Sequence, residues 1–341
     1  MTGPLTLYDY AQMANNPLVT KVVTTLVDQQ SLLVDIPLDT SGSLKKVMGR
    51  FDGANVPTPT WVPLNQTPTV TRGRFDHVEA SMNFTRDQLQ IDKALLNDPN
   101  SIGDPMGNQI MMYLKAFSKA FNDNWINNDI ATGDVNCFDG IRGRLNKATD
   151  YGIPTEFKQA LSIDITAGSI TSALADRVFR EIGLMLSRVG NSDGSGVVIY
   201  CNDFMLACLE SAARILGGGG GWNVNVDAFD RQIFKFRNAT FRNPGTRFPQ
   251  TLSGSLNRIM GTAETASGAA TTGSVYSSLL FVRYGEDAVQ GWQNADPANW
   301  FIPVGSAPDG IIEKVTTNIG IGIINPSAYD IGMISGVKVT S

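Results

Sequence analysis

The stretch from residue 35 to residue 90 constrains the fold more than any other part of the chain. Prolines and glycines recur in it too closely for a helix of any length: Pro37, Gly42, Gly49, Gly53, Pro57, Pro59, Pro63, Pro68 and Gly73. Short β-like pieces remain at residues 44–51, 60–64 and 69–84, with too little apolar content to bury a core of their own. Because long irregular segments usually serve interaction, we expect an arm that folds against a neighbouring molecule. A surface loop of an ordinary domain is the alternative.

The segment ahead of this stretch, residues 5–34, has helical spacing in its second half. Its apolar residues there are Leu18, Val22, Val23, Leu26 and Val27. A short amphipathic segment of this kind is not stable by itself, so we expect it to dock on another part of the protein.

The clearest helix of the chain is predicted at residues 104–129. Asp104 is a good N-cap and Pro105 suits the first helical position. An apolar stripe then repeats at spacings of four and three: Ile110, Leu114, Phe117, Phe121 and Trp125. Such a helix would be about 39 Å long at ~1.5 Å per residue. We interpret the aromatic stripe as core and not as a cofactor site.

The second half of the chain predicts a mixed α/β unit. Ser169 is expected to cap a helix that runs to Val189, and residues 197–201 form a short apolar strand. Asn202 and Asp203 are expected to cap a second helix. This helix–strand–helix unit would pack on a small central sheet.

Further strands are predicted towards the C-terminus, and the glycine-rich parts between them are predicted as loops. The strands are expected at residues 234–241, 278–284, 315–324 and 331–339. The second helix should run over residues 204–216 and end at the five-glycine run 217–221, and residues 262–274 should form an exposed flexible loop.

Composition narrows the class of protein. Only 17% of the 341 residues are charged, against about a quarter in ordinary proteins. Low charge suits surfaces that other subunits cover, although secreted β-proteins share the bias. A net charge of −5 argues against a protein that reads nucleic-acid sequence.

Cysteine usage and hydropathy favour a reducing compartment and no membrane span. The three cysteines fit no zinc spacing, and Cys201 and Cys208 lie in apolar surroundings typical of small buried residues. Residues 1–10 lack the pattern of a signal peptide, and no window reaches the ~18 apolar residues that a membrane span needs.

A search for catalytic side chains gives no candidate. His77 is the only histidine; Asp76 and Glu79 are near it, but no Gly-x-Ser-x-Gly elbow is present to supply a nucleophile. One histidine and three scattered cysteines cannot form the usual transition-metal ligand sets.

The glycine-rich segments do not predict a nucleotide site either. The run at residues 217–221 follows a helix and lacks the Gly-Lys-Ser/Thr ending of a phosphate loop. Residues 320–322 lack the third glycine of a dinucleotide fingerprint, and Asp227 and Asp230 fit ordinary loop solvation. We therefore predict a protein that is not an enzyme, with no catalytic, cofactor-binding or metal-binding residues and no cofactor.

Taken in order, the predicted elements resemble a known family. The α+β order of arm, punctuated β-excursion, long helix, helix–strand–helix unit and β-rich end is similar to the Hong Kong 97-type fold of tailed-bacteriophage major capsid proteins. Three local matches carry the resemblance: Leu5-Thr6-Leu7-Tyr8 to Asn16-Pro17-Leu18 with Ser31-Leu32-Leu33 to Ile36-Pro37, the helix 104–129, and Phe138-Asp139-Gly140-Ile141, which looks like the family's Phe-Asp-Gly-Leu turn.

The resemblance implies a division of the chain. Residues 1–37 would be the N-terminal arm and residues 38–85 the extended E-loop that lies across a neighbouring subunit. The P-domain would comprise residues 86–149 and 311–341, with 104–129 as its spine helix, and the A-domain residues 150–310. Residues 217–225 would be a loop at the five- and six-fold centres.

The implied function is that of a structural, self-assembling virion protein. Pentamers and hexamers of the chain would form an icosahedral shell, built in the bacterial cytoplasm around double-stranded DNA that is not read by sequence. The implied partners are a portal, decoration proteins and, because the arm begins within a few residues of Met1, a separate scaffolding protein; no membrane is implied. Lys45 and Lys46 lie in the E-loop, but no cross-linking chemistry is assigned to them.

Three alternatives remain open at this point. An encapsulin compartment would share the fold. A β-rich carbohydrate- or ligand-binding protein could use tryptophans as stacking platforms, namely Trp61, Trp222, Trp292 and Trp300. An oxidoreductase on an α/β scaffold should show the absorbance of a bound cofactor.

Overall fold

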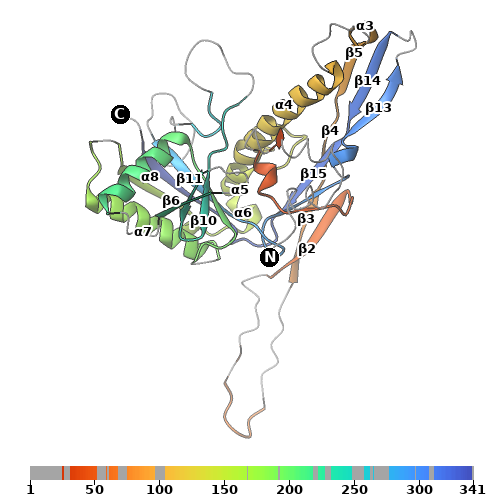
Figure 1. Ribbon diagram of the computed structural model, residues 1–341. Helices are drawn as coiled ribbons and strands as arrows, with labels where there is room; N and C mark the ends of the chain where they lie inside the picture. Colours follow the sequence, from red (N-terminus) through yellow and green to blue (C-terminus); the bar gives the residue numbers. More distant parts are fainter. Residues whose placement is uncertain are drawn as a thin grey trace.

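The chain folds into an α+β protein with two unequal lobes joined along one long helix (Figure 1). The structure, a computed structural model, describes residues 25–26, 31–51, 59, 61–67, 75–96, 104–166, 168–190, 193–217, 222–226, 232–247, 257–261, 264, 276–295, 297–306 and 311–339.

The larger lobe is built on a seven-stranded sheet. Its strand order is β6-β16-β11-β7-β10-β9-β8. The strands are β6 (Lys158–Asp164), β16 (Ile331–Lys338), β11 (Tyr276–Arg283), β7 (Val197–Tyr200), β10 (Ala239–Arg242), β9 (Gln232–Phe236) and β8 (Trp222–Val226). The central strands β16, β11 and β7 are nearly continuous apolar runs, as expected of strands covered on both faces.

Two helices belong to this lobe, α7 (Ser172–Arg188) and α8 (Asp203–Ile215), which pack against each other. The buried face of α7 has the spacing of one helix face, with Val178, Ile182 and Met185 directed towards β16 and β6. Asn202 caps α8 by accepting a hydrogen bond from the Met205 amide at 2.7 Å, as predicted. Gly217 ends α8 with a φ of 74°, which confirms its predicted role at the helix C-terminus.

The second lobe is elongated and follows helix α4 (Pro105–Asn127), which confirms the predicted long helix. The Asp104 carboxylate caps it by accepting a hydrogen bond from the Met106 amide at 3.1 Å. Two small sheets accompany α4, with orders β13-β14-β5 and β1-β12-β15-β4. Their strands are β13 (Phe301–Ser306), β14 (Ile312–Thr317), β5 (Gln88–Asp92), β1 (Leu38–Asp39), β12 (Gln290–Gln293), β15 (Ile319–Ile324) and β4 (Asn83–Thr85).

Short helical segments complete the described part of the chain: η1 (Leu32–Val34), α3 (Lys93–Leu96), α5 (Ile141–Asn146), α6 (Ala148–Tyr151), η3 (Thr155–Phe157) and η4 (Pro297–Asn299). η1 docks on α4, where the Leu32 amide donates to Asn122 Oδ1 at 2.8 Å and Leu33 is fully buried. The predicted docking is thus confirmed from residue 31 onwards, while most of the helix expected before it lies outside the described residues.

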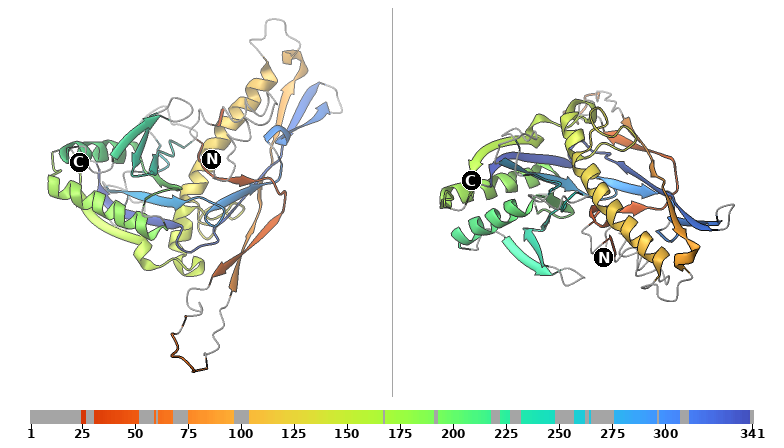
Figure 2. Two further views of the ribbon diagram at one scale, coloured as in Figure 1. Left: turned by 60° about the horizontal axis from the view of Figure 1, so that its bottom comes forward. Right: turned by 90° about the horizontal axis from the view of Figure 1, so that it is seen from above.

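Strands β2 (Lys45–Phe51) and β3 (Phe75–Ser81) form an antiparallel hairpin that joins no larger sheet in the described part of the chain. The hairpin projects from the body on the side opposite to the end formed by α3, β13 and β14 (Figure 1, Figure 2). The β-like piece predicted at residues 44–51 is confirmed as β2. The described part of the piece predicted at residues 69–84 divides at Met82 into β3 and β4, which lie in different sheets. The strand predicted at residues 60–64 is wrong for residues 61–64, which form coil and a turn.

Two further segments, each predicted as one strand, form two strands. Residues 315–324 divide at Asn318, because the chain bends there from the sheet of β14 into the sheet of β15. Residues 234–241 divide into β9 and β10, because Arg237 adopts a φ of 55° and reverses the chain. A regular apolar alternation does not reveal either bend.

Two local predictions are also corrected. The N-cap of α7 is Thr171, whose hydroxyl accepts from the Leu174 amide at 3.3 Å, and not Ser169. Glu264, within the loop predicted to be exposed, is buried, and its carboxylate pairs with Arg142 and Ser278. The remainder of residues 262–274 lies outside the described residues.

The sheets divide the chain differently from the expected domain boundaries. β16, expected with the P-domain, lies in the seven-stranded sheet, parallel to β6 and antiparallel to β11. β12 and β13, expected with the A-domain, lie in the small sheets beside α4. The chain therefore crosses between the lobes twice after β11.

Candidate assembly surfaces

The paired strands β2 and β3, called the hairpin stem below, have one face against the body. Met48, Val78 and Ala80 on that face pack on a small buried cluster formed by Met82, Trp292 and Ile324. The period of two along a strand puts these residues on one side. The stem is thus anchored by apolar contact along half of its surface.

Hydrogen bonds fix the base of the stem. The Trp292 indole donates to the Ser43 carbonyl at 2.7 Å, and Lys46 Nζ donates to Asp39 and Gln290 at 3.2 and 3.1 Å. Arg50 Nη1 donates to the Tyr151 carbonyl at 3.0 Å. The hairpin therefore leaves the body in one defined direction.

The far end of the hairpin exposes large apolar side chains. Trp61 is 101% exposed, Leu64 92% and Val62 44%. Full burial of a side chain of this size stabilises a protein by about 1.5–3 kcal/mol. A cluster of such residues on a projecting segment is typical of a surface that another molecule covers.

The stem also carries charges, which pair with one another. Lys45 and Glu79 form an ion pair across the two strands, and His77 Nε2 lies 3.7 Å from Glu79 Oε1. The hydrogen bond from Lys45 lowers the pKa of Glu79 below its ordinary value. His77 and Glu79 are both exposed on the hairpin.

The turn after α4, residues 138–141, holds the end of that helix. The Asp139 carboxylate accepts from the Ile130 amide at 2.8 Å, from Lys147 Nζ at 2.8 Å and from the Tyr151 hydroxyl at 2.7 Å. Burial alone would raise the pKa of Asp139, but these donors outweigh it, so the pKa lies below its ordinary value. Asp139 therefore acts as a charged clamp and not as an acid.

Glycine is required in this turn for close packing. A Cβ on Gly140 would collide with the backbone carbonyl of Asn124 and lie 2.7 Å from that of Trp125. A Cβ on Gly143 would meet the carbonyl of Asn128 in the same way. The Phe-Asp-Gly pattern is thus explained by packing against the last turn of α4.

A buried polar cluster joins the two lobes behind this turn. Trp125 Nε1 donates to the Tyr284 hydroxyl at 2.9 Å, which lies 2.6 Å from the hydroxyl of Tyr200 in the seven-stranded sheet. Arg144 lies over the Trp125 ring and donates to the Ile323 carbonyl of β15 at 3.2 Å. Burial raises the pKa of both tyrosines, so their hydroxyls remain protonated hydrogen-bonding groups.

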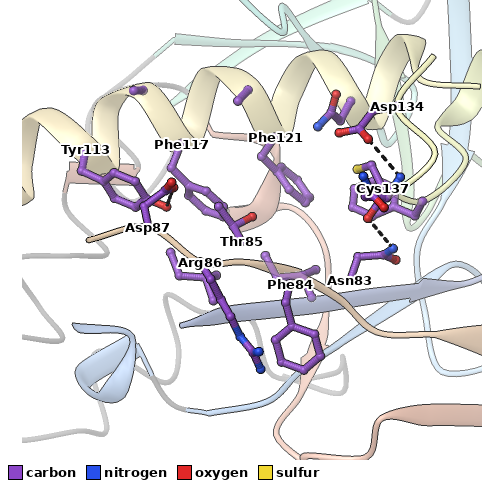
Figure 3. A pocket seen from close by; sticks show the side chains of 17 residues that line it. Asn83, Phe84, Thr85, Arg86, Asp87, Tyr113, Phe117, Phe121, Asp134 and Cys137 are labelled. Atoms are coloured by element: carbon purple, nitrogen blue, oxygen red, sulfur yellow. Dashed lines mark hydrogen bonds between the residues drawn. The ribbon is translucent and has the colours of Figure 1, made fainter. Parts of the chain in front are cut away.

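A cleft of about 470 Å³ lies between α4 and β4 (Figure 3). Phe117 and Phe121 line it from the helix, and Tyr113 closes one end by donating to Asp87 Oδ2 at 2.9 Å. Burial raises the pKa of Tyr113 to about 12 and that of the Cys137 thiol to about 11, so both keep their protons at neutral pH. The cleft offers packing and hydrogen bonding.

The tryptophans proposed as stacking platforms do not form a common site. Trp292 and Trp300 are fully buried, Trp61 is fully exposed at the hairpin end, and the side chain of Trp222 lies outside the described part. The alternative of a carbohydrate site that uses all four tryptophans is therefore wrong for Trp292 and Trp300, because both side chains are fully buried.

The cysteines and the loop carboxylates do not form a site in the described part of the chain. Cys201 is buried as predicted, whereas Cys208 is only half-buried, and all three cysteines are free. Asp227, Asp230 and residues 218–221 lie outside the described residues. Among the residues that are described, no three His, Cys, Asp or Glu side chains gather to hold a metal, and no helix has the length and apolar content to span a membrane.

No protein-family model matches the sequence, and no curated protein matches it. Solved structures match along most of the chain. The SrpI encapsulin complex from Synechococcus elongatus PCC 7942 matches with a TM-score of 0.57 and 9% identity, over 97% of this chain and 95% of that chain. The capsid of Ralstonia phage GP4 matches with a TM-score of 0.53 and 10% identity, over 90% and 88%. The structure of Microbacterium phage Oxtober96 matches with a TM-score of 0.50 and 11% identity, over 89% of each.

The chain therefore has the Hong Kong 97-type fold of phage capsid shells and encapsulins, as its order of elements predicted. The long helix predicted from the sequence is α4, and the β2–β3 hairpin lies in the predicted β-excursion rich in proline and glycine.

Proposed function

We propose that this chain is the major capsid protein of a tailed bacteriophage, whose copies assemble as pentamers and hexamers into an icosahedral shell around double-stranded DNA. The observation that carries the proposal is the projecting hairpin of this fold, with Trp61, Val62 and Leu64 exposed at its end. A subunit that leaves such residues uncovered gains stability by placing them against another copy, and the gain repeats at every position of a closed shell.

The role proposed is structural and not catalytic. Within the described part, the residues with shifted pKa values at these two places stabilise the fold. Asp139 stays charged at the turn after α4, and Tyr200 and Tyr284 stay protonated where the two lobes meet. We place the protein in the virion, after assembly in the host cytoplasm. A portal, a scaffolding protein and decoration proteins belong to this proposal as partners, with packaged DNA held without sequence reading.

We further propose domain boundaries that follow the sheets. The P-domain would comprise α4 with the sheets of β1, β4, β5 and β12–β15. The A-domain would comprise the seven-stranded sheet with α7 and α8, including β16. The N-terminal arm, the E-loop and the axial loop at residues 217–225 keep the places that the resemblance implies.

Expression of the full chain, alone and with its neighbouring genes, tests the function. Electron microscopy of the purified protein should show closed shells of uniform size, and shells formed with the neighbouring genes should protect double-stranded DNA from nuclease. A protein that stays monomeric in gel filtration would contradict the proposal.

An encapsulin compartment is the second candidate, because the encapsulin match covers nearly the whole chain. The contents of the shell distinguish the two functions. Shells that hold a single cargo protein and no nuclease-resistant DNA would favour the encapsulin.

A further inference from the structure

The cleft between α4 and β4 has an elongated apolar floor. The residues that line it from the helix recur at the spacing of one helix face: Tyr113, Ala116, Phe117, Ala120, Phe121 and Asn124. The floor therefore follows α4 for about 16 Å, at ~1.5 Å of rise per residue. Phe138 and the β15 side chains Ile319 and Ile321 complete it. A space of about 470 Å³ in this form fits a slender and largely apolar molecule.

A carboxylate lies at each end of this floor (Figure 3). Asp87 is at the end closed by Tyr113, whose hydroxyl donates to Asp87 Oδ2 at 2.9 Å. Asp134 is at the opposite end, where its Oδ1 accepts from the Asn136 amide at 2.9 Å. Both aspartates are exposed, and neither has an ion-pair partner in the described part of the chain. Each therefore keeps one carboxylate oxygen without a donor among the described residues.

Arg86 is the one cation among the described residues that line the cleft, and its charge is directed elsewhere. Its side chain points away from α4, as does that of Phe84 (Figure 3). The guanidinium lies 4.7 Å from the centre of the Phe84 ring, and Nε donates to Asn318 Oδ1 at 3.1 Å. The cleft thus has negative charge at both ends and an apolar, partly aromatic stretch between them. Aromatic rings also attract cations, which adds to the preference for a positively charged ligand.

We propose that this cleft binds a linear aliphatic polyamine. One ammonium group would pair with Asp87 and another with Asp134, and the methylene chain between them would lie along Phe117 and Phe121. Each part of such a molecule has its complement here, because methylene groups are apolar and an ammonium group donates charged hydrogen bonds to a carboxylate. A fatty acid or a nucleotide would instead bring negative charge to two carboxylates. The inference goes beyond the proposed function, because the cleft lies within one subunit and needs no shell.

Isothermal titration calorimetry of the unassembled full chain with two diamines tests the length of the site. Diaminobutane and diaminododecane carry the same charge, but only the longer molecule reaches from one end of the floor to the other. Diaminododecane should bind once per subunit and at least about tenfold more tightly, because both of its ends are paired and more methylene groups are buried. Equal affinities of the two diamines, or no saturable binding of diaminododecane, would overturn the inference.

Three variants locate the binding site within the cleft. Asp87→Asn and Asp134→Asn keep an oxygen that accepts the described hydrogen bond, and each should weaken the binding of diaminododecane by about fivefold. Ala120→Leu fills an exposed position of the floor without a change of charge and should weaken binding by at least about tenfold.

Asp176→Asn is the matched control, since it removes an exposed carboxylate from α7 on the other lobe. It should bind diaminododecane as the wild type does, and all four variants should keep the melting temperature of the wild type. Wild-type affinity in both Asp87→Asn and Asp134→Asn, or an equal loss in Asp176→Asn, would overturn the inference. So would wild-type affinity in Ala120→Leu, because the ligand would then lie outside the cleft.

Discussion

Leu279, Leu280 and Phe281 in the seven-stranded sheet are fully buried by their own subunit, whereas Trp61 and Leu64 at the end of the hairpin are covered by nothing described in it. The first region is a β-strand and the second is coil and a turn, and both carry apolar residues. The difference lies in where those residues find a partner. The sheet is completed by folding of the subunit, and we propose that the hairpin is completed only by assembly.

This comparison divides the effects of mutation into two kinds. Substitutions at the hairpin should change assembly and leave the stability of the free subunit nearly unchanged. Substitutions in the body should lower the stability of the free subunit first.

The largest effect is expected from the double variant Trp61→Ser with Leu64→Ser. Loss of both exposed anchors should abolish shells, because each contact loses about 1.5–3 kcal/mol and the loss repeats at every copy. The free energy of unfolding of the subunit should stay within about 0.5 kcal/mol of the wild-type value. Electron microscopy and urea unfolding measure the two effects. The control variant Trp61→Phe with Leu64→Met keeps the apolar surface and should assemble. Shells from the serine variant would contradict the proposal that these side chains are covered on assembly.

The next effect is expected at Gly140 in the body. Gly140→Ala places a methyl group against the carbonyls of Asn124 and Trp125 and should lower the free energy of unfolding by about 3 kcal/mol. Gly49→Ala makes the same chemical change where no described atom is near, and should leave the unfolding of the subunit unchanged. Urea titrations of both unassembled variants measure the contrast, and equal destabilisation would contradict it.

A smaller effect is expected from Asp139→Asn at the turn after α4. The variant loses charged hydrogen bonds from Lys147 and Tyr151 and should be less stable by about 2 kcal/mol at neutral pH. Because the pKa of Asp139 is below its ordinary value in the folded state, its contribution exists above the unfolded pKa and disappears as the pH falls. The difference between wild type and variant should therefore shrink towards pH 3, and a constant difference would contradict this role.

The smallest effect is expected from Asp330, which is buried beside Arg283 at the crossing between the lobes. Burial raises its pKa to about 6, although Arg283 opposes the shift. The neutral form is thus favoured in the folded state, and its contribution is present below the unfolded pKa and lost as the pH rises through about 6. Between pH 4 and pH 7, the free energy of unfolding of the wild type should fall by about 1 to 2 kcal/mol relative to that of Asp330→Asn. A gap that stays constant across this range would contradict the assignment.

Much of the fold could be predicted because local signals were strong. Asp104, Pro105 and the aromatic stripe specify α4 without reference to the rest of the chain. The density of proline and glycine between residues 35 and 90 excluded a helix there and left an extended hairpin. The glycine after α8 marked its end.

The pairing of distant strands could not be predicted, because alternation shows that a segment is a strand and not which strand lies beside it. Ser335 of β16 pairs with Ala160 of β6 across more than half of the chain. The bend at Asn318 is likewise fixed by a contact with another segment, since the backbone amide of Asn318 donates to the backbone carbonyl of Trp300 at 2.8 Å. In the sequence, Gly49 is one of several glycines and prolines that exclude a helix, and only its open surroundings in the structure set it apart.

Oxidative footprinting of Trp61 tests the central claim most directly. Trp61 should be oxidised rapidly in unassembled subunits and protected by at least about tenfold in purified shells, as expected of a side chain that another copy buries. Trp125 and Trp292 are buried by the subunit itself and should be protected equally in both states. Equal oxidation of Trp61 in free subunits and in shells would contradict the account, because the hairpin would then remain uncovered after assembly.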